Sequence, residues 1–140
     1  MSEYLNVAVE LHDSVVDSIT HVGQVVQICL RPAYLHKSVG QPGLADGIGV
    51  VQDLILEFGN GQIEGNIGDL PSDIFSGNLQ VGLQTFDNMI ELPCNIPEAV
   101  SLTVFLSPDN RKLSVSGQGL RINIDGDAVY VEEFRPNRLN

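Results

Sequence analysis

Apolar and polar residues alternate with a period of two along most of this chain, which is the pattern of strands that bury one face. The first such segment, residues 4–11, places Leu5, Val7, Val9 and Leu11 on one face. Further strands are expected from similar runs at residues 15–21, 25–30, 50–58, 79–83 and 89–92. No window of a dozen residues carries a helical stripe. The pattern therefore predicts an all-β protein of about nine to ten short strands.

Turn-forming residues separate these segments about every ten residues, which is typical of antiparallel two-sheet folds. We therefore expect a two-sheet β-sandwich of jelly-roll type, with a closed β-barrel as the alternative. A chain of 140 residues has the size of one domain. Because alternation is lost after Phe134, the prediction is a single β domain over residues 1–134 and a C-terminal tail over 135–140.

Three turn sequences predict hairpins whose registers can be tested, namely Asn60-Gly61, Ser107–Asn110 and Asp125-Gly126. The expected facing pairs are, in that order, Phe58 with Ile63, Leu106 with Leu113, and Ile122 with Val129. The third hairpin also sets Arg121 opposite Tyr130, where the guanidinium and the ring can stack. The first sets Glu57 against Glu64, which is an unfavourable pair of like charges.

Residues 31–49 interrupt the alternation and are rich in turn-forming residues, namely Pro32, Gly40, Pro42, Gly43, Gly47 and Gly49. Loops of this length are uncommon inside compact domains and often carry function. We expect a long loop here.

The formal net charge is −11, from 18 acidic and 7 basic residues. No Lys or Arg lies between Lys37 and Arg111, whereas the acidic residues of that interval are Asp46, Asp53, Glu57, Glu64, Asp69, Asp73, Asp87, Glu91, Glu98 and Asp109. Such a surface repels phosphate backbones, which argues against a nucleic-acid partner. It suits a basic protein or a divalent cation, and simple solvation of loops and outer faces is the alternative explanation.

The N-terminal residues lack the basic and apolar regions of a secretory signal, and no apolar run reaches the length of a membrane span. The two cysteines, Cys29 and Cys94, lie in unrelated segments, which indicates free thiols in a reducing compartment. We expect a cytoplasmic protein that does not contact a membrane.

Motifs for phosphate binding, a nucleophile elbow and helical zinc sites are absent from the sequence. Residues 123–127 resemble the start of a calcium loop, but Ala128 and Phe134 stand where an EF-hand needs Gly and Glu. No cofactor is predicted from motifs, and catalysis is not indicated.

The histidines nevertheless suggest one candidate site. If residues 4–11, 15–21 and 25–34 form an up-down-up meander, His12 and His36 lie at the same rim and His21 at the opposite rim. The other residues expected at the first rim are Asp13, Tyr34, Lys37 and Asp46. Two imidazoles and a carboxylate (His12, Asp13 and His36) can bind a transition metal or act as acid and base. The alternative is that these histidines only meet water or cap turns.

Tyr130 is a separate candidate, as an exposed ring that a ligand can stack on, or simply as the cross-strand partner of Arg121. These observations lead us to expect a non-catalytic binding domain with a basic protein partner. One alternative is a small metal-dependent enzyme or ligand binder that uses the His12/Asp13/His36 rim, with residues 31–49 as a cover. The other is a structural protein that forms homo-oligomers through exposed strand edges.

Overall fold

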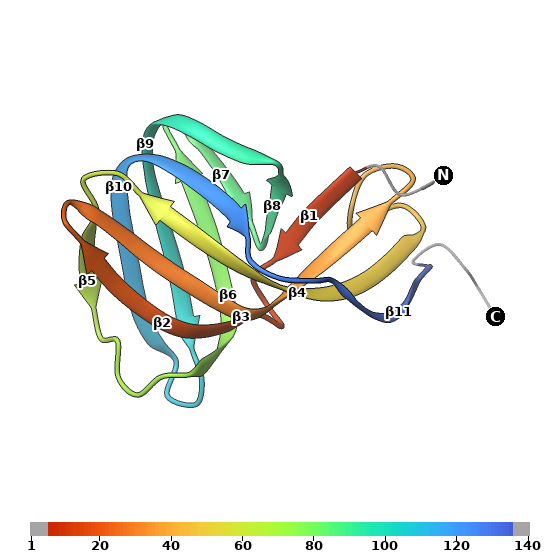
Figure 1. Cartoon of the computed structure of the whole chain (residues 1–140), viewed down its shortest axis with the longest axis horizontal. Helices are drawn as coiled ribbons and strands as arrows, with labels where there is room; N and C mark the ends of the chain where they lie inside the picture. Colours follow the sequence, from red (N-terminus) through yellow and green to blue (C-terminus); the bar gives the residue numbers. More distant parts are fainter. Residues whose placement is uncertain (1–5, 136–140) are drawn as a thin grey trace.

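The computed structural model describes residues 6–135, and all of its regular elements are antiparallel β-strands (Figure 1). The expected all-β class is therefore confirmed. The strands are β1 (Asn6–Glu10), β2 (Val15–Val22), β3 (Val25–Ser38), β4 (Gly47–Phe58), β5 (Gln62–Gly65), β6 (Ser72–Val81), β7 (Gln84–Asp87), β8 (Met89–Leu92), β9 (Cys94–Leu106), β10 (Arg111–Ile124) and β11 (Val129–Phe134).

Six of these strands form a closed barrel in the order β4-β10-β9-β6-β2-β3, because β3 pairs back onto β4. The preferred expectation of a two-sheet sandwich was wrong, and the barrel given as the alternative is the observed arrangement. The closing contact joins Val26–Leu30 of β3 to Leu54–Phe58 of β4. Closure removes the free edges that two separate sheets would leave, and alternation along the sequence does not distinguish the two arrangements.

Branched aliphatic side chains make up most of the hydrophobic core, which lies mainly inside the barrel. The largest fully buried residues are Phe58, Leu11, Ile28, Leu30, Leu35, Leu54, Leu56, Leu79, Leu102, Leu106, Leu113 and Leu120. Within the barrel strands they alternate with less buried positions, as at Leu54, Leu56 and Phe58 of β4. Small barrels have an interior that side chains fill, and here these residues form a packed core.

Beyond the barrel, β3 and β4 continue into a second sheet, which we call the extension (Figure 1). It has the order β8-β1-β3-β4-β11. β1 pairs with Tyr34–Ser38 of β3, and β11 pairs with Gly47–Val51 of β4. The long loop expected over residues 31–49 is therefore wrong, and only residues 39–46 connect the two strands. Pro32 is tolerated because it lies in a register irregularity, where its missing N–H is not needed in the ladder.

The three predicted hairpins have different outcomes. β9 and β10 form a hairpin, but Leu113 faces Val104 and not Leu106, a shift that keeps the same residues inside. The other two were wrong, because β5 pairs with β10 and β11 pairs with β4. The segment of β4 up to Phe58 already has β3 and β10 on its two sides, so it offers no edge to β5.

Charge also favours the observed pairing over a hairpin that the Asn60-Gly61 turn would close onto β4. Glu57 faces Gln27 and Arg121 in the barrel and not Glu64. Its carboxylate accepts hydrogen bonds from Gln27 Nε2 at 2.9 Å and from Asn123 Nδ2 at 2.8 Å. The like-charge pair of the expected hairpin is avoided.

Within residues 6–135, the structure has no helix that would be long and apolar enough to cross a membrane. Both cysteines are free thiols, and burial raises the pKa of Cys94 to about 11, which keeps that thiol protonated and unreactive. Of the expected C-terminal tail, residues 136–140 lie outside the described part of the chain.

Candidate functional site

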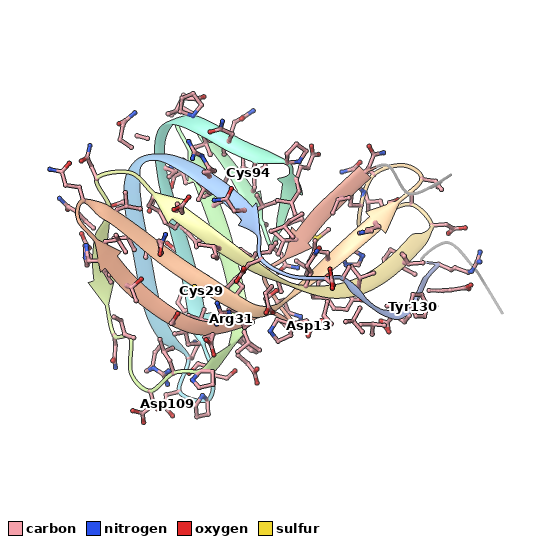
Figure 2. All side chains as sticks on the ribbon, in the orientation of Figure 1. Asp13, Cys29, Arg31, Cys94, Asp109 and Tyr130 are labelled. Atoms are coloured by element: carbon pink, nitrogen blue, oxygen red, sulfur yellow. The ribbon has the colours of Figure 1, made fainter. Side chains whose placement is uncertain are left out.

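The turn between β1 and β2 lies where the barrel joins the extension. This junction brings several predicted site residues together. His12 and Asp13 lie in that turn, and β1 pairs antiparallel with β3 so that Ala8 faces His36 and Glu10 faces Tyr34. The expected up-down-up meander was wrong, since β1 contacts β3 directly. The two histidines still lie close together, because β3 continues through the first part of the expected loop and ends at Ser38. Figure 2 shows Asp13 at the junction of barrel and extension.

Glu10 lies at the centre of this group. His36 Nε2 is 2.7 Å from Glu10 Oε1, and His12 Nδ1 is 3.7 Å from Glu10 Oε2. His12 Nδ1 is also 3.4 Å from Asp13 Oδ1. We call Glu10, His12, Asp13 and His36 the rim cluster. Sequence reasoning did not include Glu10, although its position on the polar face of the first strand, two residues before His12, was a usable signal.

Hydrogen bonds hold the turn in place. Ser14 Oγ donates to the Glu10 carbonyl at 2.6 Å and accepts from the Tyr34 amide at 2.9 Å, so it ties the turn to β3. On the other side, the His12 amide donates to Asn88 Oδ1 at 2.7 Å. Asp13 has φ +77°, a left-handed conformation that Asp tolerates better than most residues. The exposed side chains of His12 and Asp13 are thus presented on a fixed backbone.

Aromatic residues enclose His36, whose side chain is 5% exposed. Its ring makes edge-to-face contacts with Tyr34 at 5.3 Å and with Phe134 of β11 at 4.7 Å between ring centroids. Nδ1 of His36 has no hydrogen-bond partner in the described structure. The tight enclosure leaves Nε2, which faces Glu10, as the ring atom that acts in the rim cluster.

Tyr34 connects the junction to β11. Its hydroxyl donates a hydrogen bond to Glu132 Oε2 at 3.1 Å, and its ring lies over Gly49 of the intervening strand β4. A side chain at position 49 would occupy the place of the Tyr34 hydroxyl and ring. The absence of a side chain at Gly49 therefore allows the Tyr34 ring to pass over β4 and reach Glu132.

The electrostatics of the cluster favour an ionised Glu10. The hydrogen bond from His36 lowers the pKa of Glu10, and the nearby Asp13 and His12 act in the same direction. Desolvation raises the pKa of Asp13, and the neighbouring Glu10 carboxyl adds to this effect. The Glu10 and Asp13 carboxyl groups therefore lie close enough to influence each other's pKa. For Tyr34, desolvation and then the hydrogen bond to Glu132 raise the pKa to about 12.

Other predicted site residues lie elsewhere. Lys37 follows His36 on β3 and so points to the opposite face of the extension. Asp46 lies just before β4, with its carboxylate 3.7 Å from the Arg135 guanidinium. Tyr130 is an exposed residue of β11, as Figure 2 shows, and it does not face Arg121. His21 pairs with Val26 in the barrel wall. Of the predicted residues, the structure thus brings together His12, Asp13, His36 and Tyr34.

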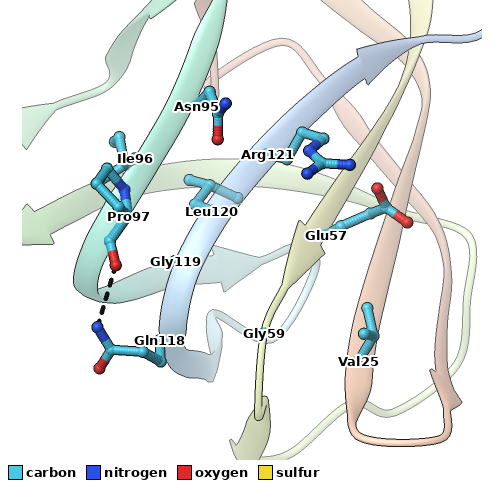
Figure 3. Close-up of a pocket in the computed structure, with 10 residues that line it drawn as sticks. All are labelled: Val25, Glu57, Gly59, Asn95, Ile96, Pro97, Gln118, Gly119, Leu120 and Arg121. Carbon is cyan, nitrogen blue, oxygen red and sulfur yellow. Dashed lines mark hydrogen bonds between the residues drawn. The ribbon is translucent and has the colours of Figure 1, made fainter.

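A separate pocket of about 330 Å³ lies at the outer surface of the barrel between β4, β9 and β10 (Figure 3). Its polar residues include Glu57, Asn95 and Arg121, and Gln118 Nε2 donates to the Pro97 carbonyl at 3.0 Å across one side. None of the rim-cluster residues lines it. Glu57 is already satisfied by Gln27 and Asn123, so the pocket offers a weaker set of free polar groups than the rim cluster.

Comparisons with known protein families, with curated proteins and with solved structures find no match for this chain.

Proposed function

We propose that this protein is a metal-binding domain that takes a divalent transition-metal ion of the zinc class at Glu10, His12 and Asp13. The observation that carries the proposal is that one ligand atom from each of these residues lies within 4.8 Å of the other two. Metal–ligand bonds of about 2.05 Å in a tetrahedral site separate the ligand atoms by about 3.3 Å. The distances of 3.4 and 3.7 Å around His12 Nδ1 approach this value, so small side-chain movements suffice.

His36 has a supporting role in this proposal. Its Nε2–H donates to Glu10 Oε1, which leaves Glu10 Oε2, the oxygen nearer His12, to bind the ion. Hydrogen bonds of this kind orient metal-binding carboxylates, and their loss typically weakens metal binding by about 10- to 100-fold. The same hydrogen bond lowers the pKa of Glu10, which keeps the ligand deprotonated at neutral pH.

The donor set selects the class of ion. One imidazole nitrogen and two carboxylates suit Zn²⁺ and related transition metals, whereas Ca²⁺ and Mg²⁺ prefer oxygen ligands alone. A bound cation would also relieve the repulsion between the Glu10 and Asp13 carboxylates that contributes to the raised pKa of Asp13.

The site supports binding more than catalysis. The side chains of His12 and Asp13 are 52% and 56% exposed on an open turn. Catalytic groups generally work in concave sites that exclude water. A role as a metal-dependent binding module therefore agrees better with this geometry than a metal-dependent enzyme.

Isothermal titration calorimetry with ZnCl₂ at pH 7 tests the proposal. We expect one site, which His12→Ala abolishes and which His36→Gln weakens by about 10- to 100-fold. His21→Ala is the matched control, because His21 is an exposed histidine of the barrel wall, and it should bind zinc as the unchanged protein does. Absence of binding at micromolar protein, or unchanged binding in His12→Ala, would rule the site out.

A basic protein partner is the second candidate function. The observation that favours it is the exposed strand β11, whose Val129 and Tyr130 are 60% and 59% exposed beside Glu132 and Glu133. The net charge of −11 steers such a partner toward the protein by long-range attraction.

A further inference from the structure

Among residues 6–135, β11 is an edge strand. It stands at the end of the strand order of the extension, with β4 on its inner side and no described strand on its outer side. Val129, Tyr130 and Val131 are 60%, 59% and 46% exposed, and Ile124, just before this strand, is 61% exposed. Edge strands that expose apolar side chains beside unpaired backbone groups are templates for the addition of another strand.

The acidic residues near β11 indicate what kind of strand would be added. The acidic residues on and just before β11 are Asp125, Asp127, Glu132 and Glu133. Two of them have basic neighbours: Arg31 lies 3.2 Å from Asp125, and Arg135 lies 2.8 Å from Glu133. The local balance remains negative. A second copy of the chain would bring another charge of −11 and the glutamates of both edges together, which opposes self-pairing.

We propose that β11 is a docking edge for an extended segment of a partner protein that alternates apolar and basic residues and joins the extension as an additional strand. Its backbone would bond to the outer edge of β11 around Tyr130, and its apolar side chains, which share one face, would cover the Tyr130 ring. Its Lys or Arg side chains would pair with the acidic residues of the edge.

Tyr130 carries much of the affinity in this arrangement. A register irregularity between Tyr130 and Glu132 interrupts the ladder with β4 at Val131. The bulge shortens the stretch of regular backbone that a partner can use. Side-chain contacts with the exposed aromatic ring must compensate, and aromatic residues are frequent hot spots in interfaces.

The inference is independent of the proposed metal site. No rim-cluster residue takes part in the docking, although Tyr34 and His36 contact Glu132 and Phe134 from the inner side of β11. A failure to bind zinc would therefore leave the docking proposal intact, and the reverse also holds.

The test uses the whole chain and a fluorescently labelled, end-capped octapeptide of alternating lysine and valine, followed by fluorescence anisotropy. We expect saturable binding that Tyr130→Ser weakens about tenfold, as loss of an interfacial hot spot does. Binding should also weaken in about 0.5 M salt, where screening shortens the reach of exposed charges. Amide hydrogen exchange should slow within β11 when the peptide is bound.

Two controls separate strand addition from general attraction to an acidic protein. Phe75→Ser removes an aromatic ring of the same exposure, 59%, from β6 of the barrel, and should bind the peptide as the unchanged protein does. A peptide with alternate amides N-methylated keeps its charge but loses backbone donors, and should bind at least about tenfold more weakly.

Equal binding of the methylated peptide, equal loss in Phe75→Ser, or no binding at millimolar peptide would overturn the proposal. Light scattering that finds a dimer split by Tyr130→Ser would also overturn it, in favour of a second copy as the occupant.

Discussion

Replacement of Gly49 by alanine tests the packing that joins the rim cluster to β11. The three heavy atoms nearest to a side chain at this position all belong to Tyr34. Gly49 is not among the glycines with positive φ, so backbone strain does not contribute. The added methyl group must displace the Tyr34 ring or compress it.

The expected cost follows from what Tyr34 would lose. Displacement breaks its hydrogen bond to Glu132, worth about 0.5–1.5 kcal/mol, and its edge-to-face contact with His36, worth about as much again. Compression costs about 1–3 kcal/mol. The reduced entropy of the unfolded chain returns about 0.5 kcal/mol on Gly→Ala replacement. We expect Gly49→Ala to lower the free energy of unfolding by about 2 kcal/mol, roughly a 30-fold change in the folded-to-unfolded ratio.

Urea denaturation followed by far-ultraviolet circular dichroism measures this cost, and a double-mutant cycle assigns it to Tyr34. In Tyr34→Ala the obstructing ring is absent, so adding Gly49→Ala should be neutral or should stabilise the protein by about 0.5 kcal/mol. An equal cost of Gly49→Ala in both backgrounds would refute the reasoning, because the methyl group would then meet something other than the tyrosine.

Two further predictions concern titration. Desolvation and the Glu132 hydrogen bond raise the pKa of Tyr34 to about 12, so absorbance at 295 nm should show one tyrosine titrating near that pH, and Tyr34→Phe should remove this component. The protonated Tyr34 hydroxyl contributes stability that is present below pH 10 and lost as the pH rises through 12. A tyrosine titration with no component near pH 12 would contradict the raised pKa. For Glu10 the sign is opposite, because its pKa in the folded protein lies below 4.5. Its ionised form stabilises the fold above pH 4.5, and this contribution disappears as the pH falls through the lowered value. Glu10→Gln should therefore be less stable than the unchanged protein near pH 6, and urea denaturation at decreasing pH should show the difference shrinking; a difference that grows on acidification would contradict the assignment.

Alternation predicted the strands better than their partners. The segments around Leu30, Phe58 and Leu106 were placed in strands because each strand has its own period of two, a local property. Partner choice depends on which edges remain free once the barrel closes, which is a property of the whole chain. The Asn60-Gly61 turn illustrates the difference: Asn60 adopts the positive φ that its sequence indicates, yet the following strand joins β10.

The candidate site could be approached from the sequence only in part. The proximity of His12 and His36 was expected from a meander that does not form, and it arises from direct pairing of β1 with β3. That pairing also makes Glu10 the shared partner of both histidines. The pairing cannot be predicted from sequence spacing, because it depends on how far β3 extends past the barrel. Tyr34 fell in a segment rich in Gly and Pro that was expected to be a loop, whereas Gly47 and Gly49 serve close approach between strands.

The barrel and the extension share β3 and β4, so they form one continuous structural unit and not two separate lobes. The 14 residues of β3 correspond to a continuous span of about 45 Å at the usual rise per residue. No linker separates the extension from the barrel, because both strands run from one into the other, and the two parts of their ladder meet at the register irregularity between Leu30 and Ala33. The position where the two parts of the ladder meet is itself part of the core, since Leu30 and Leu54 beside the irregularity are fully buried, so a substitution there would disturb the barrel and the extension together.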